Sequence, residues 1–175
     1  MYKLLADSLE QRTCFPQRFL NLQLNPENRL FPSHLLIALA AAFSADLSLA
    51  GALLGAAFPD LVDKPLAAAG ITETYHSVAH SGGTTAVLTA SVAVIPGMRA
   101  FAVGHVLHIL SDLLQVMVNQ GKDHWRFLMW PLDFSDDPLG LAPVEWFKYY
   151  MGTRAFYIET VIDVLSTAYL LYALI

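Results

Sequence analysis

The sequence predicts an all-α protein, organised as a multi-pass membrane helical bundle of about four apolar helices around a polar centre. Composition is the first observation. Of 175 residues, 55% are hydrophobic and 14% are charged, whereas soluble chains average about 25% charged residues. The mean hydropathy is +0.48. The second observation is a set of apolar segments with isolated polar residues and few strand signals, a pattern typical of bundles whose polar groups face the interior. A compact, very apolar soluble helical protein is the alternative.

The first apolar segment covers residues 35–58. It reaches the roughly 20 apolar residues that a transmembrane helix needs, but Asp46 interrupts it. We therefore expect two short helices, one over residues 33–43 and one over 47–57, joined by a turn with capping residues. Pro59 ends this hairpin.

The rest of the chain divides at glycines and prolines. Residues 60–83 are expected to form a loop with short helical pieces, and residues 98–119 the clearest helix, which glycines bound on both sides. The stretch from 85 to 95 alternates enough to resemble a strand, but its setting favours a helix across lipid. A last apolar helix is expected over 155–175, after an aromatic and acidic loop at 123–143 beside the membrane surface.

Length and charge limit the organisation and the partners. We expect a polar or amphipathic segment at 1–33 without a secretory signal, followed by one membrane-embedded domain at 34–175. The single cysteine, Cys14, cannot form an internal disulfide, and no CxxC spacing exists for a thiolate site, so a metal here needs nitrogen and oxygen ligands. The net charge of −5 without a basic run argues against nucleic-acid binding.

Three pairs of chemistry-bearing residues occur at helical spacing. Residues three or four apart lie on one face of a helix. A mixed shell of histidine and carboxylate suits zinc, manganese or iron, and it can leave a coordination position open for water. The pairs are Asp60 with Asp63, His76 with His80, and His108 with Asp112.

Each pair also has a purely structural interpretation. Asp60 follows a proline and would then cap the next turn. His76 and His80 would be loop histidines hydrogen-bonded to the backbone. His108 and Asp112 lie inside an apolar helix, where an unpaired carboxylate would cost several kcal/mol. A hydrogen bond between them without metal is the alternative to ligation.

Other polar residues are weaker candidates. His34 begins the first apolar helix and is either a further ligand of the same centre or a surface residue. His105 lies one turn before the strongest pair and would orient a ligand or line the cavity. Ser81 would donate to a substrate or, more commonly, cap a turn. Glu159 and Asp163 mark either the cavity or the interface, and we do not assign them to the metal.

From His34 to about Pro131, the chain resembles the membrane-bound metal-dependent hydrolases of the LexA-regulated type, which are distantly similar to zinc-dependent phospholipase C. Several motifs carry the resemblance in order along the chain. They are His34, the small-residue helix ending in Pro59-Asp60 with Asp63 following, His80-Ser81, the Gly104 helix with His108 and Asp112, and Trp130-Pro131-Leu132.

The resemblance implies a set of site residues. It implies metal ligation by Asp60, His80, His108 and Asp112, with Asp63, His76 and His34 as further candidates. Asp63 or His76 would then act as general base or as an extra ligand. This chain departs from the family pattern at Lys64, where many members have histidine, and at His76, near which many have arginine. Lys64 would bind a substrate phosphate or pair with Asp63.

We therefore expect a metal-dependent hydrolase in the cell membrane. It would use one or two divalent ions, zinc before manganese or iron, to activate water against a phosphoester or phosphodiester of a lipid-like substrate. Membrane lipids and that substrate are the expected partners. A noncatalytic metal-binding or transport protein is the alternative. A structural membrane protein, held together by hydrogen bonds between the polar pairs, is a second one.

Overall fold

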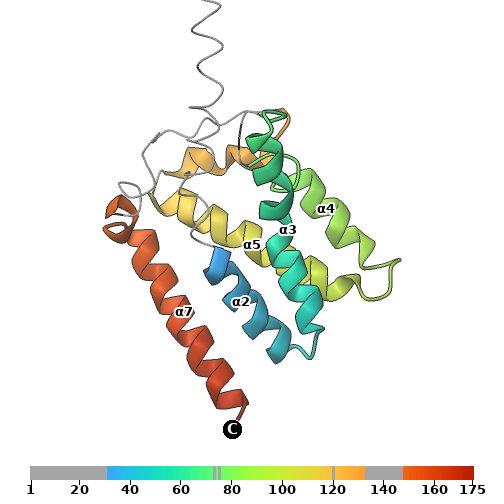
Figure 1. Ribbon diagram of the computed structural model, residues 1–175, viewed down its shortest axis with the longest axis vertical. Helices are drawn as coiled ribbons and strands as arrows, with labels where there is room; N and C mark the ends of the chain where they lie inside the picture. Colours follow the sequence, from blue (N-terminus) through green and yellow to red (C-terminus); the bar gives the residue numbers. More distant parts are fainter. Residues whose placement is uncertain (1–30, 73, 75, 120, 133–147) are drawn as a thin grey trace, which may run out of the picture.

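The computed structural model describes residues 31–72, 74, 76–119, 121–132 and 148–175 (Figure 1). All regular structure within these residues is helical, which confirms the predicted all-α class. The expected N-terminal segment 1–33 lies outside the described residues apart from its last three, so its character stays a prediction.

The first apolar segment forms two helices, as the sequence predicts. Helix α2 covers Phe31–Ser44 and helix α3 covers Leu49–Ala68. Asp46 in the turn has a φ of 52°, a left-handed conformation that aspartate adopts more readily than most residues. Ser48 caps α3 by accepting a hydrogen bond from the amide of Gly51. The chain turns back on itself here, and α2 packs against α3.

Helix α3 is longer than the sequence predicts. Our expectation of a loop with short helical pieces from residue 60 was wrong for residues 60–68, because the helix continues through Pro59 and Pro65 to Ala68. Each proline removes a backbone donor and strains the preceding turn, a local cost that packing of α3 against α2 and α5 offsets. Asp60 and Asp63 therefore lie on a helix, in its C-terminal half.

The stretch that resembled a strand is helical. Helix α4 covers Gly82–Ser91, so it begins and ends a few residues before the expected 85–95. Ser81 accepts a hydrogen bond from the amide of Thr84, which confirms its capping role. At ten residues, α4 is about 15 Å long and is too short to cross a hydrocarbon core of about 30 Å. The expectation of a helix across lipid at this point was wrong.

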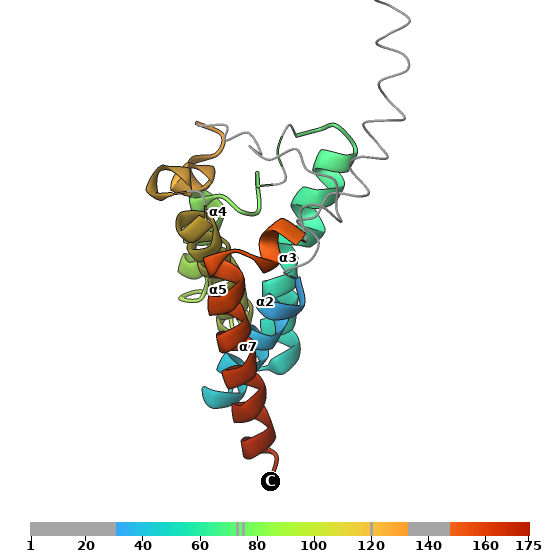
Figure 2. The ribbon, with the colours of Figure 1, turned by 90° about the vertical axis from the view of Figure 1, so that its left-hand side faces the viewer.

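Helix α5 is the centre of the bundle. It covers Met98–Asn119, the bounds that the glycines predict. It contacts α2, α3 and α4 as well as the 3-10 helix η2, Lys122–Met129, and the last helix α7, Arg154–Ala173. Figures 1 and 2 show α7 along one edge of the bundle, where it packs against α2 and α5, with the C-terminus at its foot.

Two glycines allow α3 and α5 to cross in backbone contact. A Cβ atom at Gly104 would lie 2.0 Å from the carbonyl oxygen of Ala52, and one at Gly55 would lie 2.0 Å from that of Phe101. Helix pairs that approach this closely need small residues at the contact, as is common in membranes. The interior between α3 and α5 is therefore narrow, and backbone atoms of one helix come within reach of side chains on the other.

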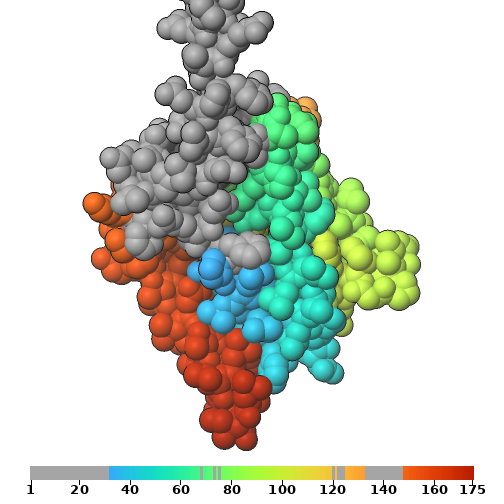
Figure 3. All heavy atoms as spheres, in the orientation of Figure 1, coloured from blue at the N-terminus to red at the C-terminus, as the bar shows by residue number. Residues whose placement is uncertain are grey.

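The interior is small and polar, whereas large apolar side chains face outwards. Most buried apolar residues are alanines, and the buried polar residues include four histidines and four acidic residues. Many large apolar side chains on α3, α4, α5 and α7 are exposed, and Figure 3 shows the continuous surface that α7, α2 and α3 form on one face. The most exposed on these helices, apart from the chain end, include Leu54, Leu61, Val87, Val161, Val164, Leu165 and Tyr172.

Two helices are long and apolar enough to cross a membrane, by length and composition. They are α5 and α7, and buried residues make up 33% of the most apolar stretch of α5 and 17% of that of α7. Helix α2 is apolar but shorter. The described residues therefore contain two candidate spans rather than the expected four.

Replacing Gly104 with alanine tests the close crossing. We expect Gly104→Ala to lower the free energy of unfolding by at least about 2 kcal/mol, because the added methyl group meets the backbone of α3 and the helices must separate. Thermal unfolding of the detergent-purified protein measures the change.

The matched control is Gly83→Ala, since the nearest atom to its added Cβ is 3.8 Å away, in Ser81. It should unfold at or slightly above the wild-type temperature, because alanine favours helix over glycine. Equal unfolding temperatures for the two variants would contradict the close crossing.

Candidate metal centre

Six side chains from four parts of the chain converge in the interior. Potential ligand atoms of these residues form three overlapping groups, and within each group the atoms lie within 4.8 Å of one another. The groups are His34 with His108 and Asp112, Asp60 with His80 and His108, and His76 with His80 and Asp112. The structure thus brings together every residue that the sequence suggested as a metal ligand except Asp63, which belongs to none of the groups found in the described chain.

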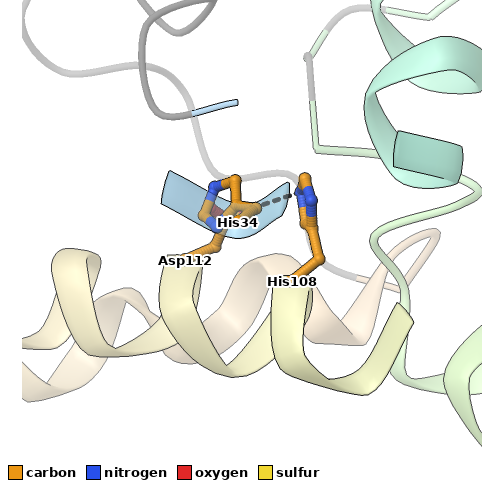
Figure 4. A group of neighbouring side chains, drawn as sticks. All are labelled: His34, His108 and Asp112. Atoms are coloured by element: carbon orange, nitrogen blue, oxygen red, sulfur yellow. Dashed lines mark ion pairs between the residues drawn. The ribbon is translucent and has the colours of Figure 1, made fainter. Parts of the chain in front are cut away.

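The centre lies where α2, α3 and α5 meet. His34 is near the start of α2, Asp60 is eight residues before the end of α3, and His108 and Asp112 are in the middle part of α5. Figure 4 shows His34 on α2 beside His108 and Asp112 on α5, with all three side chains close together. His76 and His80 come from the segment between α3 and α4.

Three of these atoms form a triangle with the dimensions of a metal site. The Nε2 atoms of His80 and His108 lie 3.2 Å apart. Oδ2 of Asp112 lies 3.4 Å from Nε2 of His80 and 3.2 Å from Nε2 of His108. In a tetrahedral zinc site with bonds of about 2.0–2.1 Å, neighbouring ligand atoms lie about 3.3 Å apart. The three atoms therefore match one face of such a site.

Hydrogen bonds at the far nitrogens fix how both histidine rings are protonated. Nδ1 of His108 lies 2.6 Å from the carbonyl oxygen of Ala56, which only accepts, so this nitrogen carries a proton. Nδ1 of His80 lies 2.8 Å from the carboxylate of Asp63 and donates to it. In a neutral ring the other nitrogen then has a free lone pair. In the neutral form of each ring, Nε2 therefore presents a lone pair to the centre.

These lone pairs and a carboxylate oxygen repel one another unless a positive charge lies among them. A proton on one ring relieves the repulsion between only two of the three atoms. A metal ion would bind all three atoms at once. The two histidines are each 1% exposed and Asp112 is 6% exposed, so water does little to relieve the repulsion. The donor set of imidazole nitrogen and carboxylate oxygen suits a divalent transition metal.

The remaining three side chains surround this triangle. Oδ1 of Asp60 lies 3.8 Å from Nε2 of His80 and 4.0 Å from that of His108. Nε2 of His34 lies 3.1 Å from Oδ1 of Asp112, and Nε2 of His76 lies 3.7 Å from its Oδ2. The two oxygens of Asp112 thus face different histidines, an arrangement that suits one ion or two ions that share this carboxylate.

Asp63 supports the centre from outside. It is fully buried, and its two oxygens accept hydrogen bonds from the backbone amides of Ser77, Ala79 and His80 and from Nδ1 of His80. Burial opposes ionisation of Asp63, which lies outside the two candidate spans, but these hydrogen bonds lower its pKa to about 2. Asp63 is therefore an anion that positions His80, as carboxylates commonly do for metal-bound histidines. The suggested roles of general base and extra ligand do not match this geometry.

Lys64 pairs with Asp60 rather than with Asp63. Its Nζ lies 2.7 Å from Oδ2 of Asp60, four residues earlier on α3. The other oxygen of Asp60 faces the two histidine nitrogens. The Asp60 carboxylate therefore lies between the Lys64 ammonium group and the centre. Asp60 is inside the helix and does not cap a turn.

His105 stands apart from the centre. Its Nε2 lies 3.1 Å from the hydroxyl of Thr85, and none of the three groups contains it. His105 is fully buried on α5, one turn from His108. Its hydrogen bond to Thr85 joins α5 to α4.

The sequence did not indicate a pair of polar contacts on α7. Ser33 donates a hydrogen bond to Asp163 at 2.7 Å, and the hydroxyl of Tyr150 donates to Glu159. The spacing of the two acids within an apolar helix was visible, but their partners come from elsewhere in the chain and follow no pattern. These contacts tie α7 to α2 and to the helical turn before α7.

Comparisons with protein-family models, curated proteins and solved structures find no significant match to this chain.

Removing the charge of Asp63 should weaken metal binding without removing a ligand. In Asp63→Asn the amide nitrogen cannot accept the hydrogen bonds that the carboxylate accepts, so the His80 ring loses its orientation. We expect a 10- to 100-fold loss of zinc affinity, in the range typical of residues that orient a ligand (about 10–100-fold). Titration against a chelator of known affinity measures it, and an unchanged affinity would show that Asp63 does not position His80.

Metal content tests the triangle directly. Detergent-purified wild-type protein should carry near-stoichiometric zinc, manganese or iron by elemental analysis, and His108→Ala and Asp112→Ala should lose it, since each removes one vertex. His105→Gln is the matched control on the same helix and should keep its metal. A folded wild type that takes up no metal when supplied with it would leave the polar pairs as hydrogen bonds that hold helices together.

Proposed function

We propose that the protein is a membrane-embedded metal-dependent hydrolase that cleaves a phosphoester or phosphodiester bond of a lipid-like substrate. The observation that carries the proposal is the triangle of His80, His108 and Asp112, in which the Nε2 atoms of the two histidines lie 3.2 Å apart. Three protein ligands leave a further coordination position, which distinguishes catalytic from closed structural zinc sites. The resemblance to membrane-bound metal-dependent hydrolases supports the same assignment.

The chain's residues have separate tasks in this proposal. His80, His108 and Asp112 hold the ion, and Asp60 or His34 completes its shell or helps to hold a second one. Asp63 and the carbonyl of Ala56 fix the two imidazoles. The bound ion would supply an acidified water and polarise the oxygen of the bond to be cleaved. Zinc suits the donor set best, with manganese and iron as alternatives.

His76 is the proposed general base. Its side chain is 25% exposed and is the most accessible of the six, and its Nε2 lies 3.7 Å from the Asp112 oxygen at the centre. A histidine this close to the centre would accept the proton of a water molecule that a bound metal acidifies. Its ring also packs against Phe127 of η2, with ring centroids 5.1 Å apart, which limits its movement.

The distribution of side chains supports a membrane location. Small and polar residues fill the interior, and large apolar residues face outwards on α5 and α7, the two candidate spans. Such a surface is stable against lipid and rare in soluble monomers. A site inside a bundle with such a surface would meet substrates that come from the bilayer, which favours lipid-like molecules with a phosphate group.

The rival function is metal binding or transport without catalysis. A transport site should be reached from both sides of the membrane, whereas the most accessible residue of this centre, His76, comes from the segment between α3 and α4. This asymmetry favours the hydrolase.

Hydrolysis by the zinc-loaded protein tests the assignment. We expect release of product from a chromogenic phosphodiester and from a phospholipid in mixed micelles, and a loss of at least about a thousandfold in His80→Ala, which removes a ligand. His105→Gln should stay within a few-fold of wild type. Fully metal-loaded protein that cleaves neither substrate, but carries zinc across the wall of a proteoliposome, would establish the transport function instead.

A further inference from the structure

Lys64 places a positive charge beside the candidate centre. Its ammonium group lies 2.7 Å from Oδ2 of Asp60, while Oδ1 of the same carboxylate faces Nε2 of His80 at 3.8 Å and of His108 at 4.0 Å. One carboxylate group therefore separates the ammonium group from the position of a metal ion. Helix α3 fixes this arrangement, because Asp60 and Lys64 are four residues apart on one face.

The net charge of the centre indicates a role for Lys64. The carboxylates of Asp60, Asp63 and Asp112 carry three negative charges, one more than the two positive charges of a single divalent ion. Without a further cation the centre would therefore repel an anionic ester. The ammonium group of Lys64 cancels this excess negative charge, and Lys is a common phosphate binder as a point charge.

Lys64 is also partly accessible to solvent. Its side chain is 18% exposed, compared with 1% for His80 and His108. The other partly exposed residue of the centre is His76, at 25%. Lys64 is therefore more open to a ligand than the two histidines of the triangle.

We propose that Lys64 is the specificity-determining residue of the site, which selects esters with an anionic phosphate group by binding one of its non-bridging oxygens. This proposal rests on the proposed hydrolase function and narrows its substrate class to phosphate esters that carry at least one negative charge. Neutral carboxylic esters are disfavoured.

A different task for Lys64 would be to hold Asp60 in place for the metal. The two tasks predict different results when the charge is removed. If Lys64 only holds Asp60, then Lys64→Met loses metal affinity and leaves anion binding by the metal-loaded protein unchanged. If Lys64 binds the substrate anion, the variant keeps its metal and loses affinity for phosphate.

The experiment uses the full chain loaded with cobalt(II), whose visible absorption reports ligands at the metal. Inorganic phosphate is the probe, and it is titrated into the wild type, Lys64→Met, Lys64→Arg and Arg99→Met. Elemental analysis measures the cobalt content of each. Arg99 is the matched control, since it is an exposed cation on α5, nine residues or about 13 Å along the helix from His108.

We expect Lys64→Met to retain its cobalt and to bind phosphate about 10- to 100-fold more weakly, the range for one charge-assisted hydrogen bond. Lys64→Arg should keep most of the affinity, and Arg99→Met should match the wild type. Equal phosphate affinity in Lys64→Met, or loss of its cobalt, would overturn the proposal for Lys64.

Hydrolysis assays separate this result from failure of the hydrolase assignment. If the wild type cleaves a phosphodiester and Lys64→Met cleaves it with an unchanged KM, the hydrolase stands and the role of Lys64 is wrong. If the metal-loaded wild type neither cleaves the ester nor binds phosphate, both proposals fail.

Discussion

The contact between α3 and α5 is the constraint on which the rest of the structure depends. At Gly55 and Gly104 the backbones touch, so that no side chain separates the helices. The carbonyl of Ala56 can then accept a hydrogen bond from His108 across the interface at 2.6 Å. This bond decides which nitrogen of the ring carries the proton, and thereby aims a lone pair at the centre. The close packing of small residues thus also determines how the His108 ring is oriented in the site.

The polar interior requires that each group have a partner. Several buried carboxylates and imidazoles share the space between α2, α3 and α5, where each unpaired charge would be costly. Most pair with one another: Asp63 with His80, Asp60 with Lys64, and Asp112 with His34. At the meeting point of His80, His108 and Asp112, however, one proton satisfies only one of the three contacts, and pairing within the chain is incomplete. A bound metal ion would complete it.

The sequence predicted those features that depend on local spacing. Helix α5 has the expected bounds, and His108 and Asp112 share one of its faces because they are four residues apart. The prediction from the sequence was wrong at Pro59. The local preference of proline predicts the end of a helix there, but long-range packing extends the helix to Ala68. The sequence also could not show the bond of Ala56 to His108, which joins residues 52 apart. A contact between a backbone carbonyl and a distant ring leaves no pattern in the side chains, so only the fold reveals it.

The four hydrogen bonds of Asp63 bear on how a metal would enter the site. All of them come from residues 77–80, the segment that carries His80. This segment is thereby fastened to α3 by contacts that involve no metal. In many small zinc domains the ligands are ordered only as the ion binds, and part of the binding energy is spent on folding. Here the ligand arrangement is preorganised, so that ions should exchange into a protein that is already folded.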